Sequence, residues 1–254
     1  DVGMDAFYQI TPSLKEALTD NTDFAQTEVD EKQINLTRFS LYFPEKRDFF
    51  LDGSNYFTFG ICGDDDNTKK TSMIPFFSRR IGLDSIGNPV SVKYGGKFTG
   101  KAGKWNFGFL HIKDDNAWDN PGYTVGRVSL DIGKQSSVGV IATNGNAFSD
   151  AGNSLAGIDI KLGSSELKGN KNIFYTLYGV KSFTSGVKGN DMSFGTELNY
   201  PNDFLNFRAG FMQIGLDESP NLMKELELPD DHKSHYVMML GSPKYRCQRP
   251  PKRD

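Results

Sequence analysis

The sequence has no long apolar run. Among its 254 residues, 37% are hydrophobic, and no stretch approaches the roughly 18 apolar residues that a membrane-crossing helix needs. This absence excludes a helical membrane protein. It does not count against a membrane β-barrel, because only every second residue of a barrel strand faces lipid.

Cysteine, excess basic charge and catalytic motifs are also scarce. Cys62 and Cys247 are the two cysteines, far apart in the chain, so disulfides are not expected to hold the fold together. The net charge is -3 and basic residues are dispersed, which argues against a nucleic-acid partner. No Gly-x-Ser-x-Gly, Walker or dinucleotide-binding motif occurs, so we expect no enzyme activity and no cofactor.

Metal-ligand patterns are incomplete. The run 64–67 is Asp-Asp-Asp-Asn, but it lacks the ligand spacing of an EF-hand and two lysines follow, which favours a solvated loop. His232 and His235 have no cysteine or further histidine nearby to complete a zinc site. His111 stands alone in a predicted strand, where a wall or interfacial side chain is expected.

Alternation of apolar and polar residues is the strongest positive feature. Eight stretches between Val90 and Phe211 alternate with a period of two, for example Trp105, Phe107 and Phe109, and the connections between them alternate between short and long. We predict an all-β fold: an antiparallel meander forming part of a transmembrane-type β-barrel, with a short irregular or helical C-terminal tail. A soluble β-sandwich or lipocalin-like barrel also alternates, with its apolar face turned inward.

The polar faces of these strands carry charges of both signs. If the apolar faces meet lipid, the lumen-facing candidates are Lys93, Lys97, Arg127, Asp131, Asp159, Lys161, Glu197 and Arg208. Such residues either set the selectivity of a pore or pair across strands and solvate the interior.

The segment 21–60 is rich in carboxylates and phenylalanine. Carboxylates pointing into a sheet need partners or water, and Phe49-Phe50-Leu51 has the character of an anchor against a wall. We therefore expect a structural plug or rim element held by salt bridges, with a catalytic carboxylate site as the alternative.

Several stretches resemble one family. Asp23-Phe24-Ala25-Gln26, Asn35-Leu36-Thr37-Arg38-Phe39, residues 43–51 (FPEKRDFFL) and residues 77–82 (FSRRIG) resemble the bacterial DUF5916 family, over residues 1–217. The motif residues are Asp23, Gln26, Glu28, Asp30, Asn35, Arg38, Pro44, Glu45, Lys46, Arg47, Phe49, Phe50, Arg79 and Arg80. The resemblance implies an outer-membrane β-barrel that usually follows a family 9-like carbohydrate-binding module, with membrane lipid as partner and glycan contacted through that module. It implies no established chemistry.

The two ends of the sequence differ from this pattern. The chain starts without a methionine or an export leader, which we interpret as an internal fragment of a longer outer-membrane protein. Such a fragment leaves two sheet edges unpaired and is not expected to insert into a membrane alone. Residues 218–254 resemble the C-terminus of nitroreductase-family flavoproteins without their FMN-binding region, which suggests a chimeric reading frame or, alternatively, a natural fusion.

Three regions follow: N-terminal strands with a plug or rim segment (1–88), the meander (89–217) and the unrelated tail (218–254). The functional hypothesis is a fragment of a bacterial outer-membrane β-barrel, non-enzymatic, with an unknown transport or anchoring role and an association with carbohydrate binding. The alternative is a soluble β-domain that assists glycan binding or hydrolysis. A third hypothesis, a flavoenzyme, rests on the tail alone.

Overall fold

The computed structural model describes residues 3–22, 45–60, 74–82, 90–115, 122–145, 153–184, 191–203, 205–213 and, for the backbone, 234–240. Several predicted features lie outside these residues: motif residues Asp23, Gln26, Glu28, Asp30, Asn35, Arg38 and Pro44, the acidic run 64–67, and His232.

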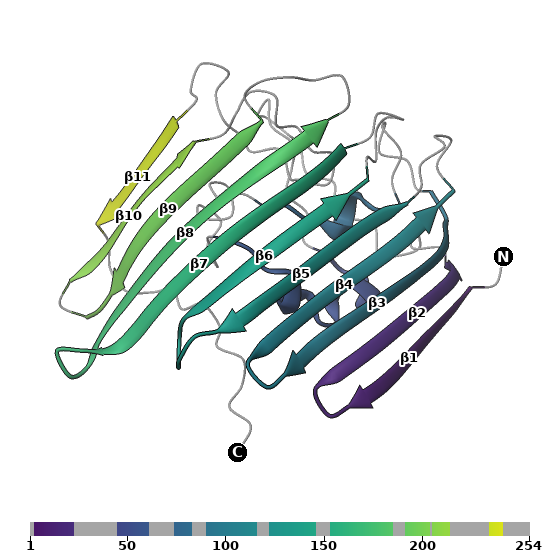
Figure 1. Cartoon of the computed structure of the whole chain (residues 1–254), viewed down its shortest axis with the longest axis horizontal. Coiled ribbons are helices and arrows are strands. Elements are labelled where there is room, and N and C mark those ends of the chain that lie inside the picture. Colours follow the sequence, from purple (N-terminus) through teal and green to yellow (C-terminus); the bar gives the residue numbers. More distant parts are fainter. Residues whose placement is uncertain are drawn as a thin grey trace.

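The described chain folds into one antiparallel sheet of 11 strands, in which each strand pairs with its neighbours in sequence (Figure 1). The strands are β1 (Met4–Thr11), β2 (Leu14–Thr22), β3 (Val92–Ala102), β4 (Trp105–Asp114), β5 (Tyr123–Asp131), β6 (Ser137–Asn144), β7 (Asn153–Leu167), β8 (Lys171–Thr184), β9 (Met192–Pro201), β10 (Asn206–Gln213) and β11 (Ser234–Leu240). Three short helices, α1 (Asp48–Leu51), η2 (Ser54–Phe57) and η3 (Ser78–Arg80), complete the described structure. The predicted all-β meander is confirmed.

The eight alternating stretches correspond to β3–β10, and the short turns form where turn residues interrupt them. Gly103 and Gly133 have φ angles of 60° and 82°, a backbone conformation that favours glycine, in the β3–β4 and β5–β6 turns. The tail differs from expectation at one place, because Ser234–Leu240 forms β11 and pairs with β10. The edge of β10 offers unpaired backbone groups, which an extended apolar segment can satisfy.

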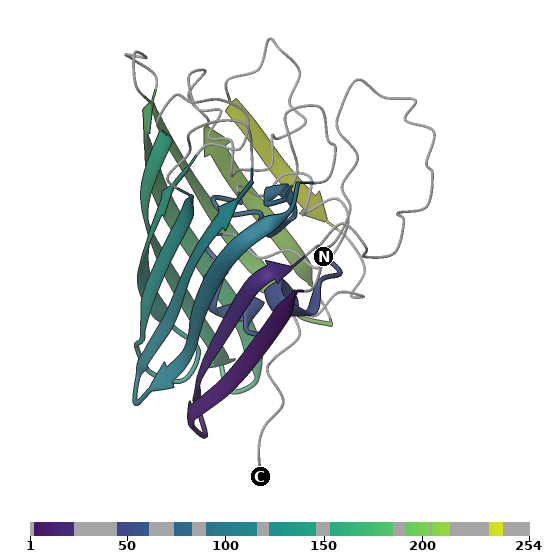
Figure 2. The same ribbon diagram turned by 90° about the vertical axis from the view of Figure 1, so that its right-hand side faces the viewer.

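The sheet is curved, and the short helices lie on its concave side (Figure 2). We call this side the inner face and the opposite side the outer face. Residues paired directly across strands share a face, so the strand registers define continuous rows. One outer row is Phe107, Val128, Val140, Ile158, Gly179 and Phe194. One inner row is Asn106, Ser129, Gly139, Asp159, Tyr178 and Gly195.

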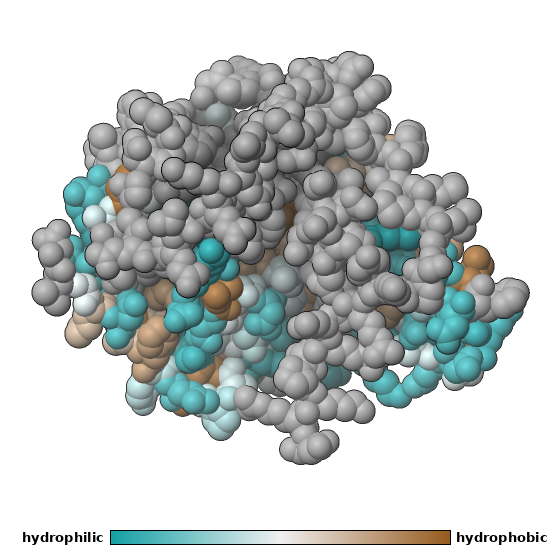
Figure 3. Space-filling view, turned by 180° about the vertical axis from the view of Figure 1, so that it is seen from behind, coloured by the Kyte–Doolittle hydropathy of each residue, from teal (hydrophilic) through white to brown (hydrophobic). Residues whose placement is uncertain are grey.

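The hydrophobic core lies on the inner face. It forms where the four buried phenylalanines Phe49, Phe50, Phe57 and Phe59 meet apolar residues of the strands, among them Leu110, Ile112, Val125, Leu155 and Val180. The space-filling view of this side shows hydrophilic and hydrophobic described residues side by side (Figure 3). Aromatic residues from outside the sheet therefore bury much of a mixed polar and apolar surface.

Glycines on the inner face provide room for these aromatic rings. A Cβ on Gly108 would lie 3.1 Å from Phe57, and one on Gly157 would lie 2.5 Å from Val180 and 2.9 Å from Phe59. A Cβ on Gly195 would lie 2.5 Å from the Tyr178 hydroxyl oxygen. These glycines sit in strands, where a side chain would normally be favoured, because the rings need the space.

We predict that Gly157→Ala destabilises the fold by about 1–3 kcal/mol, because the new methyl group overpacks the contact with Val180 and Phe59. Gly126→Ala, in β5, is the matched control, since a Cβ there would meet no atom within 4 Å. Urea unfolding followed by circular dichroism measures both. Equal stabilities for the two variants would contradict the proposed packing.

Candidate functional site between the inner segment and the sheet

Residues 45–60, here called the inner segment, lie against the inner face of the sheet. Buried Lys97, from β3, donates hydrogen bonds to the carbonyl oxygens of Phe49 and Asp52, and its Nζ lies 4.9 Å from the centre of the Phe49 ring. Lys15, from β2, forms an ion pair of 2.9 Å with the Asp52 carboxylate. The helical turn α1 of the inner segment is therefore held by two lysines of neighbouring strands.

A second contact joins the end of the inner segment to the middle of the sheet. Arg127 Nη2 lies 2.6 Å from Asp159 Oδ1, and both side chains are at least 96% buried. The Gly60 N–H donates to Asp159 Oδ2 at 3.1 Å. The Phe59 ring lies between the Arg127 guanidinium, 5.3 Å away, and the Tyr178 ring, 5.9 Å away. A buried charge pair on the sheet thus becomes the docking point of the segment.

A third contact holds the inner segment to residues 74–82. Arg47 donates from Nε and Nη2 to the Glu45 carboxylate at 2.8 and 2.7 Å, and also to the carbonyl oxygens of Ser78 and Ile81, each at 2.8 Å. The Ser78 hydroxyl donates to Glu45 at 2.6 Å. Two stretches of the family resemblance, 43–51 and 77–82, are therefore joined by one nearly buried arginine.

This environment changes the acidity of Glu45. Burial opposes ionisation and on its own would raise the pKa of the carboxyl group. The hydrogen bonds and charge of Arg47, together with the Ser78 hydroxyl, outweigh that effect, and the pKa lies below its ordinary value of 4.5. Glu45 is therefore a structural anion held by Arg47.

The predicted lumen-facing residues divide by position. Seven lie on the inner face through the strand registers: Lys97, Arg127, Asp131, Asp159, Lys161, Glu197 and Arg208. Lys93 differs, because the register shifts between Val92 and Tyr94 and turns Val92 to the inner face instead. Lys93 is half-exposed and pairs with Asp115 at 2.7 Å.

The inner-face charges form opposite-sign pairs. Arg208 donates to Glu197 at 2.8 Å across β9 and β10. Asp131 pairs with Lys101 and accepts a hydrogen bond of 2.9 Å from Asn106. These pairs match the alternative in which the charges stabilise the interior. His111, on the outer face, shares a hydrogen bond of 2.8 Å with Thr124.

The described motif residues belong mainly to the inner segment. Glu45, Arg47, Phe49 and Phe50 make the contacts described above, whereas Lys46 is exposed. Arg79 and Arg80 lie in η3, beside the carbonyl groups that Arg47 binds. Both carboxylate oxygens of Glu45 accept hydrogen bonds, from Arg47 and from Ser78.

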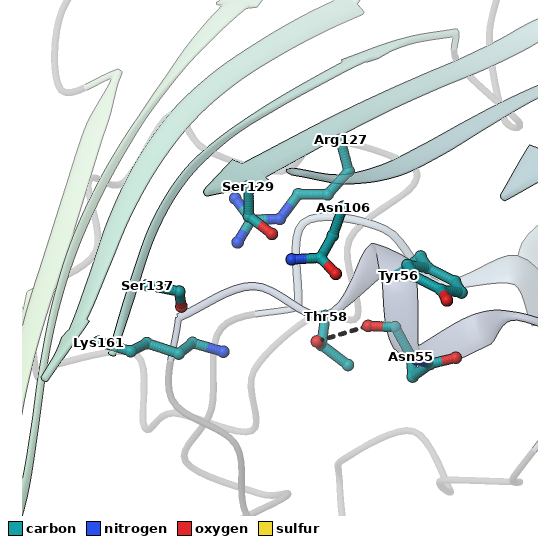
Figure 4. A pocket seen from close by; sticks show the side chains of 8 residues that line it. All are labelled: Asn55, Tyr56, Thr58, Asn106, Arg127, Ser129, Ser137 and Lys161. Carbon is teal, nitrogen blue, oxygen red and sulfur yellow. Dashed lines mark hydrogen bonds between the residues drawn. The ribbon is translucent and has the colours of Figure 1, made fainter. Parts of the chain in front are cut away.

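A polar cavity of about 140 Å³ lies between the inner segment and the sheet (Figure 4). The inner segment contributes Asn55, Tyr56 and Thr58 to its lining. The sheet contributes Asn106, Arg127, Ser129, Ser137 and Lys161. Sequence reasoning singled out two of these, Arg127 and Lys161, by charge. The alternation also puts Asn106, Ser129 and Ser137 on the same face, but nothing in it links them to residues 55–58.

The comparisons with known proteins give one family. The model of the domain of unknown function DUF5916 matches residues 1–104, which include β1, β2, the inner segment, η3 and β3. No curated protein and no solved structure matches the chain. Within the described residues, no helix is long and apolar enough to cross a membrane. The first 104 residues are therefore similar to DUF5916.

We predict that stability falls on acidification below about pH 4.5, the unfolded-state value. The folded-state pKa of Glu45 is lowered, so its contribution is complete above the unfolded value and is lost as the pH falls through the folded one. Urea unfolding at a series of pH values measures this, with Glu45→Gln as the comparison. If the variant keeps the same acid dependence as the wild type, the assignment to Glu45 is wrong.

We also predict that Asp159→Ala destabilises the fold by about 3–5 kcal/mol, because it leaves the buried Arg127 charge without its partner. The double substitution Arg127→Met with Asp159→Leu should cost less, since it removes both charges and refills the space. Lys134→Gln, which breaks an exposed ion pair with Glu166, should have no measurable effect. A double variant less stable than Asp159→Ala would contradict this account.

Proposed function

We propose that this chain forms part of the wall of a bacterial outer-membrane β-barrel whose interior is occupied by the inner segment. In the intact protein the barrel would have a transport or anchoring role associated with carbohydrate binding through a separate module. The observation that carries the proposal is an exposed apolar outer face opposite an inner face whose charged side chains contact one another or the inner segment.

The outer face supports a lipid environment. Phe109, Val140, Ile158 and Phe194 belong to outer rows of different strands and are 45–52% exposed. Within the described residues, a single sheet is present and nothing packs over these rows. A soluble protein rarely exposes an apolar surface this continuous, which favours lipid contact over the soluble alternative.

One strand carries an uninterrupted apolar stretch on its outer face. Along β7 the outward side chains are apolar from Ala156 to Leu162. The polar residues Ser154 and Ser164 lie at the two ends of this stretch. At about 3.4 Å per residue this stretch is roughly 20 Å long. Strands of a transmembrane β-barrel are tilted by about 35–45° and cross an apolar band about 25 Å tall, so this stretch would span part of the band.

The position of the inner segment favours a barrel whose interior is filled by protein next to β2–β8. Its four phenylalanines are buried, and its carbonyl and N–H groups bind Lys97 and Asp159 of the sheet. The charged side chains of the inner face therefore form hydrogen bonds with the inner segment as well as with water. This arrangement favours an anchoring or gated role over a permanently open pore.

The proposal is tested by placing a lysine at two different depths on the outer face and comparing the cost in stability. Ile158→Lys, made in the intact protein of which we propose that this chain is a part and folded into phosphatidylcholine vesicles, should cost about 2–4 kcal/mol, because the charge enters the apolar band. Ile132→Lys is the matched control, since Ile132 is equally exposed but lies in the β5–β6 turn. Its cost should be at most about 1 kcal/mol, as for interfacial positions.

Urea unfolding in the vesicles measures both free energies. Equal, small effects of the two substitutions would count against a membrane wall, as would an intact protein that stays folded and soluble without detergent. Heat-modifiable gel mobility provides an independent measure of barrel folding.

A further inference from the structure

The charged groups that line the polar cavity have one sign. Arg127 and Lys161 are its charged lining residues, and no acidic residue lines it among the described parts of the chain. Figure 4 shows the Lys161 side chain extending across the cavity toward Thr58, with the Arg127 guanidinium beside Ser129. Both cations therefore border the same small space.

The nearby carboxylate compensates for one of these charges. Asp159 lies 2.6 Å from Arg127 Nη2 but 3.9 Å from Lys161 Nζ, and its second oxygen accepts the Gly60 N–H. Two cations thus share one carboxylate, which leaves one positive charge in excess. Lys161 is 26% exposed, so this charge is only partly hydrated.

Arg127 also has unused hydrogen-bonding capacity. Its Nη1 is buried and donates to no acceptor within the described residues, although the side chain is 96% buried. A buried guanidinium group with a free donor is costly unless a partner is supplied. The polar cavity is lined by the same arginine together with Asn106, Ser129 and Ser137.

We propose that the cavity binds the carboxylate or phosphate group of a small polar solute. The Arg127 guanidinium and Lys161 Nζ would donate charge-assisted hydrogen bonds to the anion. The amide of Asn106 and the hydroxyl groups of Ser129 and Ser137 would bind the neighbouring polar atoms. This inference goes beyond the proposed function and holds whether or not the outer face meets lipid.

Isothermal titration of the folded full chain with sodium phosphate, sodium glucuronate and neutral glucose tests the proposal. We expect saturable binding of phosphate or glucuronate at one site per chain, and none of glucose. Tighter phosphate binding would identify a phosphate group as the ligand, and tighter glucuronate binding an acidic sugar. No saturable binding of either anion, or equal binding of glucose, would overturn the proposal.

Lys161→Gln should weaken anion binding about tenfold or more, because it removes one charge-assisted contact. Lys161→Arg keeps the charge and should stay within about threefold of the wild type on the same scale. Lys134→Gln is the matched control, since it removes the same charge at an exposed turn. Equal weakening by Lys161→Gln and Lys134→Gln would mean that anions are attracted only by overall charge, and the cavity assignment would be wrong.

The urea midpoint of each variant is measured with and without the anion. A ligand that binds the folded state raises this midpoint, and at a given concentration the rise is larger for a tighter ligand. The wild type and Lys161→Arg should therefore gain stability on adding the anion, and Lys161→Gln should not. A gain of the same size in Lys161→Gln would also overturn the proposal.

Discussion

The buried ion pair between Arg127 and Asp159 is the contact on which the interior depends. Two charges removed from water must have partners with good geometry, because the desolvation penalty otherwise lowers the free energy of unfolding. Here the partners come from the inner segment: the Gly60 N–H binds Asp159, and the Phe59 ring covers Arg127. The polar inner face and the segment that covers it therefore require each other.

The outer face has the opposite requirement. Its apolar rows continue across β3–β10 and remain exposed in the described structure. An ordinary soluble sheet would turn these rows toward a core and its charged rows toward water. This sheet does the reverse, and its core forms between charged strands and a short aromatic segment. The inversion, more than any single residue, is what favours a lipid-facing wall.

Part of the candidate site follows from the pattern of residues. Alternation is sufficient to group Arg127, Asp159 and Lys161 on one face, because side chains alternate along any regular strand. The anchor role expected for Phe49, Phe50 and Leu51 agrees with the burial of the two phenylalanines but not with Leu51, which is 44% exposed. The position of Lys93 could not be predicted, because a one-residue register shift reverses the faces and depends on how β3 pairs with β4. Likewise, nothing local indicated that Ser234–Leu240 would join β10.

The sequence by itself determined the all-β meander, the eight central strands and which residues of a regular strand share a face. The reason is that a period of two acts locally and repeats along the chain. Tertiary structure alone decided which strand-borne charge meets which part of the inner segment. Contacts such as Asp159 with Gly60 join residues 99 positions apart. Their formation depends on sheet curvature, register and the space left by glycines, which are properties of the assembled fold.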